Sequence, residues 1–228
     1  MCGRFATTLP SDAMAQLFAA QPGNDLPDVP NFNVCPTNQI HVVTGAGDGT
    51  RRLSAMRWGF VPRWYKKPNG GPLLINARAE TIATKPAFAE AARLRRALVI
   101  ASGFYEWTKT PEGIRNPWYI TPTRGEVLAM AAVWQDWTST QGDLLRCCAL
   151  VTTAANRKMG KIHHRMPVIV KQEDWALWLG EAGHGAAKLM HAADEEALQM
   201  HRVDRAVNSN RASGVDLIAP LLDEDDTF

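Results

Sequence analysis

Between residues 40 and 170 the chain contains six short runs rich in apolar and β-branched residues, separated by turn-forming residues. Runs of this length and composition are typical of β-strands, and several have turn residues at hairpin-like spacing. They do not alternate strictly with helices. We therefore predict a single α+β domain on a mostly antiparallel, barrel-like β-sheet core with peripheral helices. The predicted strands are Ile40–Val43, Leu73–Ala77, Leu98–Trp107, Val127–Trp137, Leu144–Thr153 and Met166–Val170.

Helical stretches are fewer than strands. One helix is expected to start at Ser11 or Asp12, either of which can cap it, and to run through Ala20. The other predicted helices are Lys85–Leu94, Glu173–Leu179 and Asp194–Met200, and the predicted loops are Gln21–Asn33, Gly45–Thr50 and Lys66–Gly71. No internal repeat or low-complexity linker divides the chain, so we predict one domain over residues 1–222 and a solvated acidic tail over residues 223–228.

Several classes of protein are excluded by the same sequence. The longest unbroken apolar run, Val127–Trp134, has eight residues, whereas a membrane-spanning helix needs roughly 18 or more. The first residues contain no apolar stretch typical of a secretory signal. Four cysteines without a CxxC pair, and no HExxH motif, support neither a disulfide scaffold nor a zinc site. We expect a reduced, cytoplasmic protein without metal or other cofactor, in which Cys147 and Cys148 point to opposite faces of a strand.

The net charge of +2 is unevenly distributed along the chain. Residues 1–50 carry −3, residues 51–100 carry +9, residues 101–170 carry +3 and residues 171–228 carry −7. The basic segment could form an electropositive face that attracts polyanions. Alternatively, its arginines and lysines could pair with the acidic C-terminal segment across the fold.

Cys2 is the first candidate for chemistry. If Met1 is removed, Cys2 carries a thiol and an α-amine on one residue, and such an amine has a pKa of roughly 7.7–8. The neutral amine can attack an aldehyde to form a Schiff base, and the thiol can then close onto the imine carbon as a thiazolidine. The same thiol could instead be a peptidase nucleophile, or a cysteine at this position could have no function.

Glu106 is the second candidate because it lies at the end of a strongly apolar run. Strand alternation puts Phe104 and Glu106 on one face, and Tyr105 and Trp107 on the other. A carboxyl group in these surroundings is expected to be partly desolvated and able to exchange a proton near neutrality. The alternative is a buried structural carboxylate paired with an arginine.

Two further segments carry polar groups. In Ile162–Val168, His163 and His164 precede Arg165, and alternation allows at most one histidine to enter a given pocket. In Ile75–Thr81, alternation aims polar side chains at one face, which is either a solvated surface or a substrate-binding floor. That second row consists of Asn76, Arg78 and Glu80.

Five segments occur in the order and approximate spacing of one known family, namely Met1–Phe5, Trp58–Pro62, Asn76–Thr81, Gly103–Trp107 and Ile162–Val168. Asn33–Thr37 and Arg205–Asn208 also match it. From Met1 to about Pro220 the chain resembles the SOS response-associated peptidase family, the abasic-site processing proteins that protect such sites in single-stranded DNA. Departures are minor: Pro68–Gly71 lengthens one loop, and Cys35 replaces a small apolar residue.

The resemblance implies roles for particular residues. Cys2 would form the thiazolidine with the ring-opened abasic sugar, and Asn76 would position the Cys2 amine and the sugar. Glu106 would act as acid and base in ring opening, and His163 would assist the Schiff-base chemistry and its reversal. The residues that would contact DNA are Arg4, Arg78 and Arg165 at phosphates, and Trp64 and Tyr65 at bases beside the lesion.

The resemblance therefore implies a DNA-damage response protein that cross-links itself to abasic sites in single-stranded DNA and shields them from strand cleavage, with lyase-like and thiol autopeptidase activity. Two alternatives remain open: a Cys2-dependent thiol peptidase that removes its own first residues, and a non-covalent single-stranded DNA-binding module. The expected partners are single-stranded DNA with abasic sites and replication-fork proteins. We expect a monomer without membrane contact, located in the cytoplasm and associated with the nucleoid when on DNA.

Overall fold

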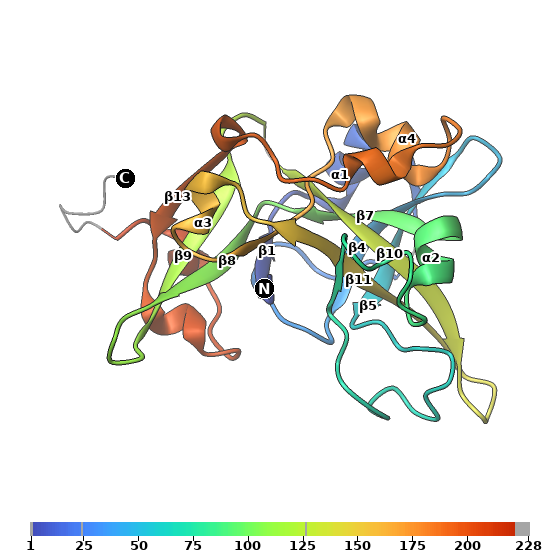
Figure 1. Ribbon diagram of the computed structural model, residues 1–228, viewed down its shortest axis with the longest axis horizontal. Coiled ribbons are helices and arrows are strands. Elements are labelled where there is room, and N and C mark those ends of the chain that lie inside the picture. Colours follow the sequence, from blue (N-terminus) through green and yellow to red (C-terminus); the bar gives the residue numbers. More distant parts are fainter. Residues whose placement is uncertain (1, 24, 126, 222–228) are drawn as a thin grey trace.

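Five strands form a closed barrel in the computed structural model, which describes residues 2–23, 25–125 and 127–221 (Figure 1). The barrel strands are β4 (Gln39–Gly45), β5 (Arg51–Trp58), β7 (Arg96–Ala101), β10 (Leu128–Thr138) and β11 (Leu144–Ala154). Antiparallel pairing runs in the order β5–β4–β7–β10–β11. A parallel pairing of β11 with β5 then closes the ring. The predicted mostly antiparallel, barrel-like core is confirmed.

A second sheet of five strands is antiparallel throughout, in the order β13–β9–β8–β1–β3. Its strands are β1 (Phe5–Thr7), β3 (Asn31–Val34), β8 (Gly103–Lys109), β9 (Arg115–Pro122) and β13 (Leu198–Arg202). The run predicted as one strand, Leu98–Trp107, is divided between the two sheets, because β7 ends at Ala101 and β8 begins at Gly103. A Cβ atom at Gly103 would lie 2.5 Å from the Tyr119 ring, so this crossing requires glycine.

Three short strands extend the barrel. β2 (Ala20–Pro22) pairs in parallel with β5, β6 (Asn76–Arg78) pairs in parallel with β11, and β12 (Arg165–Pro167) pairs antiparallel with β11. Thr152 of β11 lies opposite both Arg78 and Pro167, on its two sides. The same end of β11 therefore holds the Asn76 segment on one side and the segment that follows His163 on the other.

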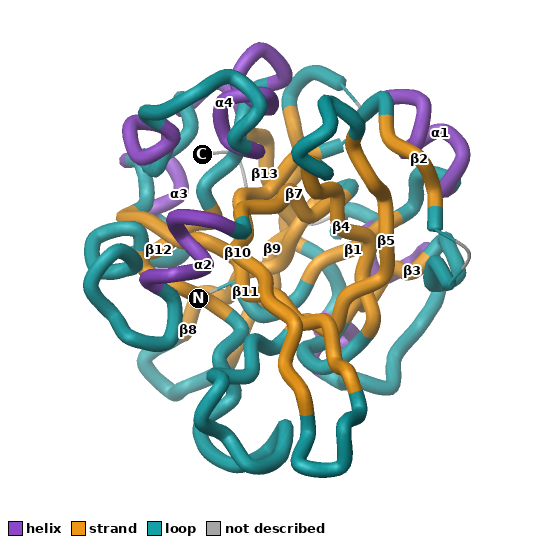
Figure 2. Tube along the Cα trace, turned by 90° about the vertical axis from the view of Figure 1, so that its right-hand side faces the viewer, coloured by secondary structure: helices purple, strands orange, loops and turns teal. Residues whose placement is uncertain are grey.

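The helices are short and lie outside the sheets, as Figure 2 shows. They are α1 (Ser11–Leu17), α2 (Ala89–Leu94), α3 (Arg157–Gly160) and α4 (Trp175–Leu179), with 3-10 turns η1 (Gln172–Asp174), η2 (Ala186–Leu189), η3 (Glu195–Ala197), η4 (Arg205–Asn208) and η5 (Val215–Ile218). No helix in the described ranges is long and apolar enough to cross a membrane.

Several predicted element boundaries are wrong. The first helix ends at Leu17 because Ala19 has a positive φ of 48° and Ala20 starts β2. Neither Ser11 nor Asp12 caps it: Pro10 is the N-cap, and the Ser11 hydroxyl instead contacts His41.

Asp194–Met200 is not a helix. It has a single 3-10 turn, η3, after which β13 begins, because Leu198 is buried in the core and its strand pairs with β9. The predicted helix Lys85–Leu94 is helical only in α2, and the predicted loop Gln21–Asn33 includes the end of β2 and most of β3. The predicted acidic tail lies outside the described residues.

Candidate functional site

Cys2 lies three residues before the start of β1 at Phe5, and β1 pairs with β8, the strand that carries Glu106. The pairing continues toward Cys2, since the N–H of Tyr105 donates to the carbonyl of Arg4 at 2.9 Å. The Cys2 carbonyl accepts a 2.9 Å hydrogen bond from Nδ2 of Asn76 at the start of β6. The first residues of the chain are thereby held between the second sheet and the end of β11.

The Cys2 side chain is fully buried in the apolar core. This burial raises the pKa of the Cys2 thiol far above its usual value, and the nearby Glu106 carboxylate raises it further. The thiol is therefore neutral at physiological pH in this arrangement, and a neutral thiol is a poor nucleophile.

Glu106 is 2% exposed, and the alternation predicted along its strand is confirmed. Phe104 packs in the core that contains Cys2, whereas Tyr105 packs in a separate cluster with Tyr119. Oε1 of Glu106 lies 3.8 Å from Nδ1 of His163. A carboxyl group and an imidazole at this separation can exchange a proton directly after a small movement, or through one water molecule.

His163 is oriented by the start of β12. Its Nδ1 accepts a hydrogen bond from the backbone N–H of Arg165 at 3.0 Å and lies 3.1 Å from the Arg165 carbonyl oxygen. The prediction that only one of the two histidines enters a given pocket is wrong, because His163 and His164 line the same pocket with ring centroids 4.4 Å apart. The chain bends at His164 before β12 begins, so strand alternation does not apply there. Electrostatic repulsion between the two imidazoles is the main cause of a lowered pKa of His164.

The pocket at this junction has a volume of about 620 Å³. Glu106 and His163 line it together with basic and polar side chains that could bind an anionic substrate, namely Arg4, Lys109, Arg115, His164 and Asn208. The indole of Trp107 also lines it, held by a 2.6 Å hydrogen bond from its Nε1 to Oδ1 of Asn208.

The predicted DNA-contacting arginines have different surroundings. Arg4 donates to Oδ1 of Asn33 at 2.6 Å and to the carbonyl of Val207 at 2.9 Å while it lines the pocket. Arg78 is exposed at the end of β6. Arg165 is buried and already paired.

The guanidinium group of Arg165 donates to both carboxylate oxygens of Glu80, at 2.7 and 3.0 Å, and to the carbonyl of Thr152 at 2.7 Å. This geometry ties β12 to β11 and to the residues after β6. It leaves Arg165 better suited to holding the His163 segment in place than to direct contact with a phosphate.

Trp64 and Tyr65 lie outside this pocket, in the loop that follows Val61. Trp64 is 61% exposed, and the two rings meet edge to face with centroids 6.3 Å apart. Trp137 in β10 fixes the loop through a 2.9 Å hydrogen bond from its Nε1 to the Tyr65 carbonyl. In both ribbon views this loop lies beside the projecting β10–β11 hairpin (Figure 1 and Figure 2).

Lys109 and Arg115 are pocket residues that the sequence reasoning missed. They lie opposite each other in the β8–β9 pairing, and the Arg115 guanidinium carbon lies 5.0 Å from the centroid of the Trp107 ring. A hairpin predicted from β8 to β9 would have placed Lys109 and Arg115 opposite each other, on the strand of Glu106 and the strand next to it. The sequence does not indicate this hairpin, because Asn116 and Pro117 at the start of β9 are residues typical of loops.

The ion pairs of the basic segment 51–100 show whether the acidic C-terminal segment neutralises it. Among ion pairs between described residues, Arg51 is the one member of the basic segment 51–100 that pairs with the acidic segment 171–228, through Glu181 at 2.8 Å. Arg63 and Arg95 pair with Glu90 inside their own segment. Within the described chain, the C-terminal acids therefore do not neutralise the basic segment.

Comparison with known proteins relates this geometry to named relatives. Residues 1–210 match the family described as SOS response associated peptidase (SRAP). The chain is 31% identical to abasic site processing protein YoqW of Bacillus subtilis over 96% of this chain and 99% of that protein. It is 31% identical to abasic site processing protein YedK of Escherichia coli over 97% and 100%. It is 30% identical to abasic site processing protein HMCES of Rattus norvegicus over 96% of this chain and 76% of that protein.

A solved structure has the same fold. The crystal structure of a protein from Bacteroides thetaiotaomicron superposes with a TM-score of 0.85 at 22% identity, covering 97% of this chain and all of that chain.

Proposed function

Because the chain belongs to the SOS response associated peptidase (SRAP) family, we propose that it processes abasic sites in DNA by forming a covalent thiazolidine between Cys2 and the sugar aldehyde. The observation that carries the proposal is the convergence of Cys2, Asn76, Glu106 and His163 from four separate segments. The relatives named as abasic site processing proteins support the choice of substrate.

The chemistry starts after Met1 has been removed. The Cys2 amine attacks the aldehyde carbon of the open sugar, and loss of one water molecule gives an imine. The thiol sulfur then bonds to the same carbon, the π electrons of the C=N bond move to nitrogen, and the proton lost from the thiol is transferred to that nitrogen, which becomes the ring amine of the thiazolidine. The hydrogen bond from Asn76 to the Cys2 carbonyl holds this residue in place while both of its groups react at one carbon.

Glu106 and His163 supply the proton transfers. An abasic sugar is mainly a closed hemiacetal, so a proton must be moved before the aldehyde is available. Glu106, buried beside Cys2, is suited to that ring opening. His163 is less buried and lies at the pocket wall, where it can move protons between imine and thiazolidine in both directions.

In the chain that still carries Met1, the raised pKa of the Cys2 thiol disfavours attack by a thiolate. A peptidase mechanism needs a deprotonated sulfur to start, whereas the aldehyde reaction starts at the amine and needs the thiol only after the imine has formed. The same four residues could also serve self-processing, and intact-mass spectrometry separates the two activities, because self-processing removes leading residues whereas cross-linking adds the mass of the DNA.

DNA is held by groups around the pocket. The cations of Arg4, Arg78, Lys109 and Arg115 can bind phosphates, and the exposed Trp64 ring can support a base. Arg165 contributes by fixing the His163 segment through its pairing with Glu80.

A denaturing gel tests the proposal. The purified protein is incubated with a single-stranded oligonucleotide that contains one abasic site and is loaded without heating. We expect a band of protein joined to DNA that is absent for the same oligonucleotide without the abasic site. If the protein binds the abasic strand in a native gel but forms no band of this kind, the covalent mechanism is wrong.

A further inference from the structure

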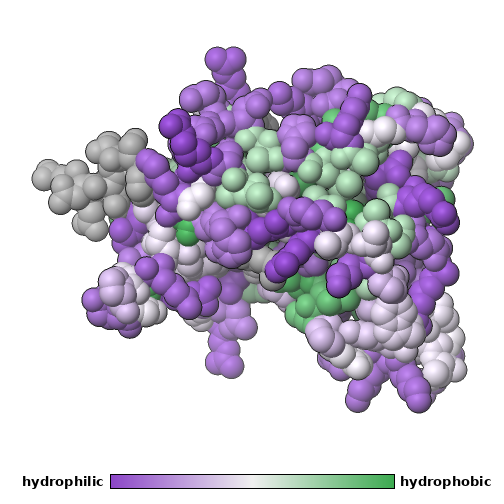
Figure 3. Space-filling model, in the orientation of Figure 1, coloured by the Kyte–Doolittle hydropathy of each residue, from purple (hydrophilic) through white to green (hydrophobic). Residues whose placement is uncertain are grey.

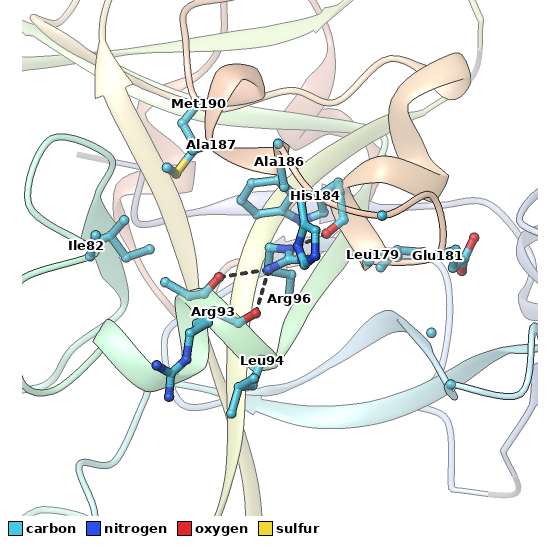
Figure 4. Close-up of a pocket in the computed structure, with 18 of the residues that line it drawn as sticks. Ile82, Arg93, Leu94, Arg96, Leu179, Glu181, His184, Ala186, Ala187 and Met190 are labelled. Atoms are coloured by element: carbon cyan, nitrogen blue, oxygen red, sulfur yellow. Dashed lines mark hydrogen bonds between the residues drawn. The ribbon is translucent and has the colours of Figure 1, made fainter.

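A second and larger pocket shares no lining residue with the pocket at Glu106 and His163. Its volume is about 1530 Å³. It lies between α2, the turn that joins β4 to β5, and the segment after α4, and Figure 4 shows Arg93, Arg96 and His184 around it. The space-filling view shows weakly apolar surface among hydrophilic side chains over the region of α2 and α4 (Figure 3).

The walls of this pocket are mostly small or aliphatic. Glycines and alanines from two loops make up much of the lining, and larger aliphatic groups come from Ile82, Leu94, Leu179 and Met190. Leu94 is 61% exposed, so part of this aliphatic lining is open to solvent. Trp178, the one tryptophan in the lining, is 1% exposed and offers no face on which a nucleic-acid base could stack, so the exposed ring in the described lining is the imidazole of His184.

The acidic groups at this pocket are already paired. Glu181 accepts hydrogen bonds from Arg51 at 2.8 and 2.9 Å, and Glu90 pairs with Arg63 and Arg95 at 3.1 and 3.0 Å. Within the described ranges, Arg93, Arg96 and His184 form no ion pair with a carboxylate.

Arg96 is half-buried, and its guanidinium donates to three backbone carbonyls, those of Ala92 and Arg93 in α2 and that of Trp178 in α4. Burial lowers the pKa of Arg96 because no opposite charge compensates for its desolvation. These three hydrogen bonds use Nε and Nη1 of Arg96, so the N–H groups of Nη2 take no part in them. The pocket thus combines an aliphatic lining with positive charge that the protein itself does not neutralise.

We propose that this pocket binds an acidic peptide segment of a partner protein, with an aliphatic side chain between the two loops and carboxylates at Arg93 and Arg96. Charge complementarity selects a partner segment that is both acidic and apolar. A single DNA strand would use the charge, but apart from the His184 imidazole the described lining is aliphatic and offers its bases no exposed ring for stacking. The proposal does not depend on the chemistry at Cys2.

The test uses the full chain and a fluorescently labelled synthetic peptide in which leucines alternate with pairs of aspartates. Arg93→Glu reverses an exposed charge at the pocket, and Ala187→Trp fills the pocket while leaving its charges in place. Arg124→Glu, in the turn after β9, is the matched charge reversal outside the pocket. Circular dichroism and the melting temperature show whether each variant is folded.

We expect Arg93→Glu and Ala187→Trp each to weaken peptide binding by roughly tenfold or more, the effect of about 1.4 kcal/mol, and Arg124→Glu to change it little. A peptide with asparagine in place of aspartate should bind more weakly than the acidic one. Amide hydrogen exchange should slow in the loops at 45–50 and 180–190 when the acidic peptide is bound. Covalent capture of abasic DNA should be unchanged in all three variants.

Equal peptide binding by wild type and both pocket variants would overturn the proposal. It would also be overturned if a single-stranded oligonucleotide without an abasic site displaced the peptide and its binding depended on Arg93, since the pocket would then belong to the DNA surface. If the wild-type protein bound the peptide but did not capture abasic DNA covalently, the proposed function would be contradicted and the peptide proposal would still stand.

Discussion

Nδ1 of His163 lies 3.8 Å from Oε1 of Glu106, although Glu106 belongs to the second sheet and His163 to the segment that leads into β12. β8 carries Glu106 in the second sheet, and His163 precedes β12 at the edge of the barrel. Asn76 enters the same region through β6, on the other side of β11. The site is therefore formed where the two sheets meet, and its geometry depends on the long-range pairings of β11.

Glu106→Gln should slow adduct formation with a natural abasic sugar by roughly a hundredfold or more, the usual scale of general acid–base catalysis. Glutamine keeps the shape and the hydrogen-bonding oxygen but cannot exchange the proton that opens the sugar ring. A small open-chain aldehyde, which needs no ring opening, should react with this variant at nearly the wild-type rate. Time courses of both reactions provide the check, and equal impairment with the two aldehydes would refute this role.

His163→Ala should slow adduct formation less than Glu106→Gln and should also slow release. A group that moves protons between imine and thiazolidine serves both directions of the reaction. Release is measured as exchange of the bound protein onto a competing abasic oligonucleotide. His191→Ala is the control, because His191 is an exposed histidine that does not line the pocket. Faster release by His163→Ala would contradict the assignment.

The sequence predicted the central strands, the alternation along β8 and the segments that meet at the site. It did not predict β5 or β9, because β5 contains three arginines and β9 contains a proline near its start. It also could not reveal the parallel contact between Cys148 of β11 and Trp58 of β5 that closes the barrel, since no local pattern encodes such a pairing. Cys147 and Cys148 do point to different sides, into separate clusters, as predicted.

The role of Arg165 could be assigned only from the position of its side chain in the structure. The sequence motif shows that an arginine follows two histidines, but it does not show which carboxylate forms an ion pair with that arginine. In the structure Glu80, 85 residues away, accepts two hydrogen bonds from the Arg165 guanidinium group. The row predicted in Ile75–Thr81 thus divides into Asn76 at Cys2, Arg78 in solvent and Glu80 at Arg165.

Binding to single-stranded DNA should weaken steeply as salt increases. Counterion release gives a slope of about −0.7 in the logarithm of affinity against the logarithm of salt concentration for each phosphate neutralised. Arg78→Ala should make this slope shallower by about one such step, because Arg78 is exposed and lies beside the site. Titrations at several salt concentrations measure the slope, with Arg124→Ala as the control, and a salt-independent affinity would show that phosphates are not the contacts.

Glu80 should make the stability of the protein depend on pH. The hydrogen bonds from Arg165 hold the pKa of Glu80 below its usual value. A carboxyl group with a lowered folded-state pKa stabilises the fold above its unfolded pKa, about 4.3, and loses this effect as pH falls through the folded value. Glu80→Gln should therefore lower the melting temperature at pH 7, and the difference from wild type should shrink progressively below about pH 4.3. The effect is moderate because the Glu80 side chain is 48% exposed, and a difference that stays constant down to pH 2 would contradict it.

Intact-mass spectrometry of the protein after incubation with abasic single-stranded DNA tests the covalent mechanism most directly. For protein whose Met1 has been removed, we expect a gain equal to the oligonucleotide mass minus one water molecule, and no such gain for Cys2→Ala. Cys35→Ala, which removes a half-buried thiol elsewhere, should react like wild type. Loss of leading residues without a mass gain would indicate the peptidase, an unchanged mass would indicate non-covalent binding, and a wild-type gain in Cys2→Ala would contradict the account.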